Sequence, residues 1–175
     1  MSIILFPFAV SIQIFIFGSF LKNKIFKNFE TDLSIDLIIS LFFLSNIFFF
    51  LNFFFSLNKF INSIVFVIPL FYLFFVDKKY LTKLLINSTI FTIFFILFIS
   101  FDTVNRPDAG LYHLPFISIL NENKIIIGSA NLHFRFGHTS ILQYLDAGYK
   151  NYIFNDLGIL IPRAIFLFAT CYFFI

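Results

Sequence analysis

Residues 2–21 read SIILFPFAVSIQIFIFGSFL, a run without a single charged side chain. About 20 apolar residues in a helix cross the ~30 Å hydrocarbon core of a bilayer, so this run predicts a transmembrane helix. A cleaved signal peptide has basic residues before its apolar core and small residues at its end. Here the basic residues Lys22, Lys24 and Lys27 follow the run, so we interpret it as a retained span.

The rest of the chain has the same character. It is 60% hydrophobic and 12% charged, with 33 phenylalanines, whereas soluble domains are about 45–50% apolar and about 25% charged. Further apolar runs at 33–57, 64–76, 84–101 and 158–175 predict four more spans. The expected fold is therefore an all-α, polytopic bundle of about five transmembrane helices in contact with membrane lipid.

Charge and cysteine content exclude several classes of protein. The net charge of +3 is small and scattered along the chain, which argues against a nucleic-acid partner. The single cysteine, Cys171, excludes a disulfide or a cysteine-based metal site within the chain.

The lysines predict the orientation in the membrane. Three lie in residues 22–27 and three in residues 77–83, while the turn between the second and third spans has only Lys59. Because lysines and arginines are enriched in cytoplasmic loops, we expect both lysine-rich loops in the cytoplasm and the N-terminus outside. In a bacterial inner membrane, the segment after residue 101 then faces the periplasm or exterior.

The segment after residue 101 separates the first four predicted spans from the fifth. Residues 1–101 are expected to form four spans, residues 102–156 a long extracytoplasmic loop, and residues 157–175 a fifth span. The apolar ending of the fifth span indicates truncation, as in an N-terminal fragment of a longer protein. The loop holds every histidine in the chain and two of its three arginines. Such a concentration of ionisable groups and glycines makes the loop the candidate site.

Short helices are expected within the loop. Asn105 followed by Pro107 and Asp108 is typical of a helix start, and Pro115 is expected to break or kink that helix. Thr139 or Ser140 predicts the cap of a second helix. We expect both helices to lie along the membrane surface.

Two motifs in the loop carry a resemblance. Asp108, Tyr112, His113, Leu114 and Pro115 form the pattern D-x-x-x-Y-H-L-P, and residues 131–137 form N-L-H-x-R-x-G. Over residues 100–165 the chain resembles polytopic bacterial membrane glycosyltransferases of the GT-C type, which take sugars from lipid-phosphate donors. Ala109 stands where many of these proteins have a second acid, and four spans precede the loop where one is usual.

The resemblance implies roles for individual residues. A carboxylate would take a proton from the acceptor hydroxyl, and cations would offset charge on the departing phosphate. Asp108 is the expected base, with Asp102 as the second candidate. The expected donor is a polyprenyl-phosphate sugar, with no cofactor and no metal. The residues expected to bind it are Arg106, Tyr112, His113, His133 and Arg135.

Simpler roles stay open for these residues. Asp108 fits a helix N-terminus, Asp102 an interfacial position and Tyr112 an interfacial anchor. Arg135 fits an ion pair with Glu122 or Asp146. His133 and His138 are five residues apart, and on a helix they point about 140° away from each other, which argues against a shared metal.

Two other functions also stay open. One is an envelope polysaccharide polymerase or ligase, which would depend on arginine and histidine more than on an acid. The other is a membrane scaffold or transporter part. Transporters place charges near the bilayer midplane, and the first four predicted spans lack such charges.

Overall fold

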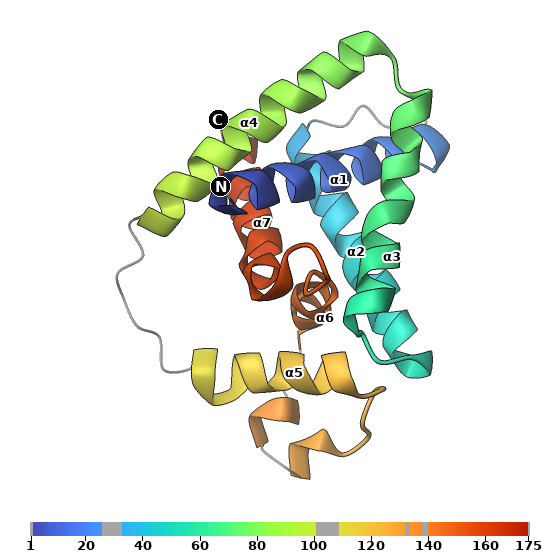
Figure 1. The fold of residues 1–175 in the computed structure, drawn as a ribbon, viewed down its shortest axis with the longest axis vertical. Coiled ribbons are helices and arrows are strands. Elements are labelled where there is room, and N and C mark those ends of the chain that lie inside the picture. Colours follow the sequence, from blue (N-terminus) through green and yellow to red (C-terminus); the bar gives the residue numbers. More distant parts are fainter. Residues whose placement is uncertain (1, 26–32, 101–108, 132–133, 138–139, 175) are drawn as a thin grey trace.

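The computed structural model describes residues 2–25, 33–100, 109–131, 134–137 and 140–174 (Figure 1). Within these ranges every regular element is a helix or helical turn, and none is a strand. The predicted all-α class is therefore confirmed.

Four helices have the length and apolar character of membrane spans. They are α1 (Ser2–Lys24), α2 (Leu33–Phe54), α4 (Lys78–Ser100) and a final helix of two parts. The final helix begins as the 3₁₀ segment η5 (Asn155–Leu160) and continues as α7 (Ile161–Phe173). The chain is thus a multi-pass membrane protein with four candidate spans.

The run at 64–76 forms a shorter apolar helix rather than a fifth helix of spanning length. It belongs to α3 (Lys59–Leu70), which continues as the 3₁₀ segment η1 (Phe71–Phe75). The Asn58 side chain caps α3 by accepting hydrogen bonds from the backbone N–H groups of Phe60 and Ile61, each at 3.1 Å. Because of this cap, the helix begins within the stretch that the sequence predicted as a turn.

Helix α2 lies at the centre of the packing. Its buried residues Leu37, Leu41, Leu44 and Phe48 recur at helical spacing, and α2 contacts α1, α6 and α7. On other faces Phe42, Phe50 and Phe53 are exposed, as expected for side chains that contact lipid.

Small residues allow α1 and α2 to approach closely. Ser40 Oγ on α2 donates a hydrogen bond of 2.7 Å to the carbonyl of Ile14 on α1. A Cβ atom added at Gly18 would lie 2.8 Å from the carbonyl oxygen of Asp36, so no larger residue fits there without a shift. Close backbone contact through small residues is common between membrane helices.

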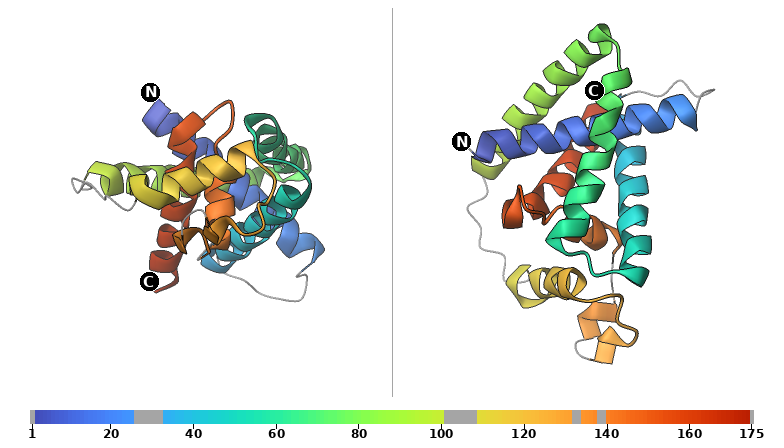
Figure 2. Two further views of the ribbon diagram at one scale, coloured as in Figure 1. Left: turned by 90° about the horizontal axis from the view of Figure 1, so that it is seen from below. Right: turned by 45° about the vertical axis from the view of Figure 1, so that its right-hand side comes forward.

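The predicted loop forms the far end of the molecule. A π-helical turn, η2 (Ala109–His113), leads into α5 (Leu114–Glu122). Pro115 lies in the first turn of α5, where its missing N–H costs nothing, so it begins the helix instead of breaking it. Figure 2 shows the short segments η3 (Ser129–Asn131) and η4 (Phe134–Gly137) beyond α5.

The second helix of the loop, α6 (Ile141–Gly148), is more enclosed than the sequence predicted. All residues from Gln143 to Gly148 are buried, and α6 contacts α2, α5 and α7. The expectation that it lies along the membrane surface stays a prediction, and the structure shows in addition that the helix packs into the core of the protein.

Candidate functional site

The structure brings together three of the predicted substrate-binding residues. The Tyr112 and His113 rings lie with their centroids 4.3 Å apart. The guanidinium carbon of Arg135, from η4, lies 4.5 Å from the centroid of the Tyr112 ring. It also lies 5.6 Å from the centroid of the Phe134 ring. A cation over an aromatic face is attracted by the negative face of the ring, so Tyr112 helps to orient Arg135.

Helix α6 positions His113. Ser140 caps α6, and the Gln143 side-chain oxygen accepts a 3.0 Å hydrogen bond from the Ser140 backbone N–H. This bond fixes the amide of Gln143 with its Nε2 toward His113 Nδ1, at 3.2 Å. Since an amide nitrogen is a donor only, Nδ1 acts as the acceptor and the neutral ring carries its proton on Nε2. The predicted cap at Ser140 is thereby confirmed.

Four predicted site residues lie outside the described residues: Asp102, Arg106, Asp108 and His133. The same is true of the predicted helix start at Asn105 and of Thr139 and His138. Asp108 directly precedes η2 in the chain, and His133 directly precedes η4. Their roles stay predictions.

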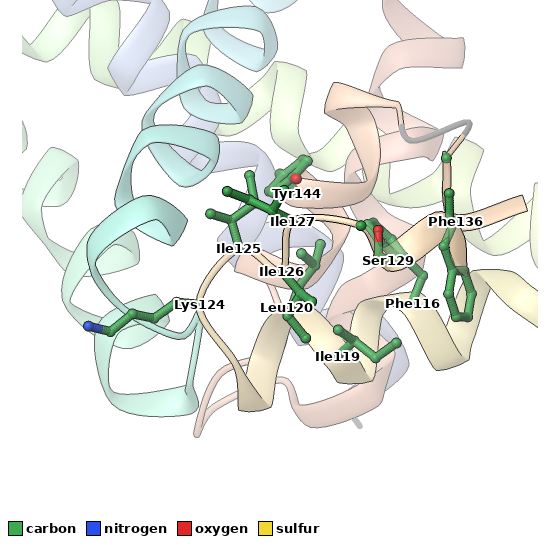
Figure 3. Close-up of a pocket in the computed structure, with 13 residues that line it drawn as sticks. Phe116, Ile119, Leu120, Lys124, Ile125, Ile126, Ile127, Ser129, Phe136 and Tyr144 are labelled. Atoms are coloured by element: carbon green, nitrogen blue, oxygen red, sulfur yellow. The ribbon is translucent and has the colours of Figure 1, made fainter. Parts of the chain in front are cut away.

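A cavity of about 290 Å³ lies among α5, the segment 124–130, η4 and α6 (Figure 3). Phe116 and Tyr144 line it from α5 and α6, and Phe136, the neighbour of Arg135, lines it from η4. The segment 125–127 supplies three isoleucines, of which Ile127 is 97% exposed. Figure 3 shows the Lys124 ammonium directed away from the cavity. The cavity is therefore mainly apolar, and Phe136 connects its lining to Arg135 along the chain.

Buried asparagine amides tie the loop to the membrane helices. Asn121 Nδ2 on α5 donates hydrogen bonds to the carbonyls of Leu57 at 2.7 Å and Ala147 at 2.9 Å. Asn62 Nδ2 on α3 donates to the same two carbonyls, at 2.7 and 2.8 Å. These bonds join α3, α5 and α6 at one junction. The sequence analysis singled out neither residue as a candidate for the site.

Asn52 performs a similar function from α2. Its Nδ2 lies within hydrogen-bond distance of the carbonyls of Leu120, at 3.4 Å, and Asn123, at 3.1 Å. The backbone N–H of Ile125 in turn donates to the carbonyl of Asn52 at 3.0 Å. Asparagines within membrane helices commonly bond a neighbouring segment, and Asn52 does so.

A buried ion pair joins α6, in the predicted loop, to α7. Asp146 on α6 is fully buried and contacts Arg163 on α7, with Oδ2 at 2.5 Å from Nη2 and 2.7 Å from Nε. Burial raises the pKa of the Asp146 carboxyl to about 6, and the two bonds from Arg163 oppose that rise. The expected alternative of an Arg135–Asp146 pair is therefore wrong, because Asp146 pairs with Arg163.

The described residues contain no group of three or more histidine, cysteine or acidic side chains placed to hold a metal ion. Burial raises the pKa of the Tyr144 phenol, which therefore stays protonated and offers an O–H donor at the cavity. The described chemistry of the site consists of arginine, histidine, tyrosine and amide groups.

The helices and the polar loop define the class: a multi-pass, all-α membrane protein whose loop is integrated into the helical core. The chain belongs to the DUF8201 family, described as a domain of unknown function, with residues 1–175 matched. Neither the curated proteins nor the solved structures contain a match. The family description includes no glycosyltransferase activity, so that activity is a proposal.

Proposed function

We propose that this chain is part of a GT-C-like glycosyltransferase that moves a sugar from a polyprenyl-phosphate donor on the extracytoplasmic face of the membrane. The observation that carries the proposal is the position of Arg135. It lies on the Tyr112 ring, in an exposed segment, and its sequence neighbour Phe136 lines a mainly apolar cavity.

This combination suits an amphipathic donor. The planar fork of arginine matches the oxygens of a phosphate, and the isoleucine-rich cavity wall suits the first part of a hydrocarbon chain. His113 adds an imidazole whose tautomer is set by Gln143. In this proposal residues 102–156 form the extracytoplasmic site, and residues 1–101 and 157–175 hold it at the membrane.

The acid residues complete the proposed mechanism. Asp108 takes the proton from the acceptor hydroxyl as that oxygen attacks C1 of the sugar, and the lipid phosphate departs with the electrons of the broken bond. Arg135, with Arg106 and His133, offsets the charge on the departing phosphate. Asp102, just after α4, is the alternative base.

A second candidate is an envelope polysaccharide polymerase or ligase. It is favoured by the composition of the described cluster, in which Tyr112 contacts both Arg135 and His113. Such an enzyme would depend on Arg135 and His113 more than on Asp108.

The test is sugar transfer from lipid phosphate to acceptor in membranes that contain the full-length protein. We expect Asp108→Asn to lower transfer about 10²–10⁴-fold, the usual contribution of a general base, with Asp102→Asn near wild type. Arg135→Lys should also lower transfer, because an ammonium does not reproduce the bidentate fork. Lys150→Gln is the control, because Lys150 is a lysine of the same predicted loop that does not line the cavity.

These variants distinguish the proposed glycosyltransferase from the polymerase or ligase. Loss of transfer in Arg135→Lys with normal transfer in both acid variants would favour the polymerase or ligase. Normal transfer in all three variants, with the proteins inserted, would contradict any catalytic role and leave the loop a structural cover.

A further inference from the structure

A groove of about 610 Å³ lies between α2 and α3, two helices that run side by side in Figures 1 and 2. Three residues of each helix, spaced to share one helix face, contribute to its lining: Leu44, Ile47, Leu51, Ile61, Ile64 and Val65. Helix α3 also contacts α1, whose Phe17 lines the groove. The volume is within the range of ligand pockets, about 300–1,000 Å³.

The lining offers a ligand almost nothing polar. Among the described residues that line the groove, only Asn58 has a polar side chain. Its Oδ1 accepts the two capping hydrogen bonds at the start of α3, and its Nδ2 donates to Ser56 Oγ at 3.3 Å. Both ends of this amide are therefore engaged within the protein. A ligand of this groove is consequently held by apolar contact, which is the way a hydrocarbon binds.

The groove lies along a candidate membrane span. Residues 44–51 belong to α2, which is long and apolar enough to cross a bilayer, and α3 is a shorter apolar helix beside it. The medium around such a span in a bilayer is hydrocarbon. Two occupants are therefore available at this depth: the acyl chain of a phospholipid, or a helix of another polypeptide.

The kind of side chain in the lining argues against a helix. Helices that pack closely in membranes do so through small residues, as Gly18 and Ser40 do between α1 and α2. The described lining of the groove contains no glycine, alanine or serine, and consists mainly of leucine, isoleucine and phenylalanine. These bulky side chains prevent the close backbone approach that a packed helix needs.

The size of the groove leads to the same conclusion. A helix with its side chains is about 10–12 Å wide and rises about 5.4 Å per turn. A groove of about 610 Å³ therefore holds little more than roughly one turn, which is too short a contact for a stable pair of helices. A hydrocarbon chain is thinner and flexible, so it can follow an irregular wall of leucine and isoleucine.

We propose that the groove between α2 and α3 binds an acyl chain of a membrane phospholipid, held as a structural lipid. The chain supplies the van der Waals contacts that the facing side chains of α2 and α3 do not make with each other. Bound lipid therefore stabilises the α2–α3 pair. This site does not depend on the proposed sugar transfer.

The test uses the full chain in detergent with two lipids of the same headgroup, dimyristoyl and dihexanoyl phosphatidylcholine. Native mass spectrometry measures bound lipid and oligomeric state, and thermal unfolding measures stability. We expect a dimyristoyl lipid adduct on the monomer. At about 100 times its Kd this lipid should raise Tm by about 5–10 °C. Dihexanoyl phosphatidylcholine, whose chains are too short to fill the groove, should do neither.

Val65→Phe narrows the groove without a change of polarity and should remove both the adduct and the rise in Tm. Val67→Phe is the matched control, because Val67 lies on the same helix, is 40% exposed and is not part of the lining. It should bind lipid as the wild type does.

A second measurement leaves the groove open. The chain has no tryptophan, so Phe60→Trp in the lining and Phe42→Trp outside it each give a single fluorescent reporter. Both positions have similar exposure, 61% and 58%. Phosphatidylcholine with brominated acyl chains should quench the Phe60→Trp reporter at low lipid content and then saturate. Quenching of Phe42→Trp should rise in proportion to the lipid content of the micelles.

Three results would overturn the proposal. The first is equal retention of the two phosphatidylcholines, because the site would then not depend on the acyl chain. The second is the same quenching curve for both reporters, which is expected if lipid only surrounds the helices. The third is a dimer without bound lipid that dissociates in Val65→Phe, which would assign the groove to a second copy of the chain.

Discussion

Asp146 is the only charged side chain buried in the part of the chain that the structure describes. Its Oδ2 has Arg163 as partner, while Oδ1 has no hydrogen-bond partner there. A buried carboxylate that loses its cation is costly because the remaining charge is both desolvated and unpaired. The pair therefore fixes α6 against α7 more through the penalty of breaking it than through its net attraction.

We expect Arg163→Gln to lower the free energy of unfolding by about 3 kcal/mol at pH 7.5, the low end of the range for breaking a buried pair. The low end applies because the Arg163 side chain is 45% exposed. Asp146→Asn should cost less, since it leaves no buried charge. Thermal unfolding in detergent measures both changes.

The matched control for this pair is Lys150→Gln. Lys150 Nζ lies 2.9 Å from Asp156, whose side chain is 78% exposed. An exposed pair contributes about 0–1 kcal/mol. Equal losses in Lys150→Gln and Arg163→Gln would show that burial of Asp146 has no energetic consequence.

The Asp146 carboxyl also predicts how the stability of the protein changes with pH. The pKa of Asp146 is about 6 in the folded protein against an ordinary value of 3.8, so between these values the folded state binds more protons than the unfolded state. Its contribution to stability therefore grows as the pH falls from about 6 to about 4 and is lost as the pH rises through that window. The loss caused by Arg163→Gln should accordingly be smaller at pH 5 than at pH 7.5.

At the scale of elements, α6 depends on its N-terminal cap. Ser140 Oγ accepts a hydrogen bond from the backbone N–H of Leu142 at 3.3 Å, and Gln143 returns a bond to Ser140. Ser140→Ala should destabilise the protein by about 1 kcal/mol, and Ser140→Asp should retain most of that stability. Ser118→Ala on α5 is the control: it removes only an exposed bond to Glu122 and should change stability by less than about 0.5 kcal/mol. An equal effect of both alanine variants would contradict the capping role.

The elements show what the sequence could and could not predict. Long apolar runs predicted α1, α2, α4 and the α7 region, because length and apolarity largely decide whether a helix spans a membrane. The start of α3 was missed because Asn58 is equally typical of a turn and of an N-cap. The burial of α6 was missed because its polar residues Gln143 and Asp146 find their partners, His113 and Arg163, only in the folded protein.

The residues of the candidate site could also be predicted only in part from the sequence. Tyr112, His113 and Arg135 were singled out by residue type and motif, but their contact depends on the return of the chain through α5 and η4. The asparagines Asn62 and Asn121 gave no distinctive signal, because an amide beside apolar residues marks turns as often as it marks buried junctions.

At the scale of the whole molecule, the lysine-rich helix ends and the α5 region lie at opposite ends of the structure (Figure 1). This separation agrees with the proposed topology, in which residues 22–32 and 77–83 are cytoplasmic and the loop is extracytoplasmic. The proposed transfer requires that topology, because the donor is expected on the outer face.

Thiol accessibility tests this requirement most directly. In a Cys171→Ser background, single cysteines at Asn23, Lys79 and Asn123 are treated with a membrane-impermeant thiol reagent on intact cells. The account predicts labelling at Asn123 and protection at Asn23 and Lys79 until the cells are permeabilised. Labelling at Lys79 with protection at Asn123 would contradict it by placing the Tyr112–His113–Arg135 cluster in the cytoplasm.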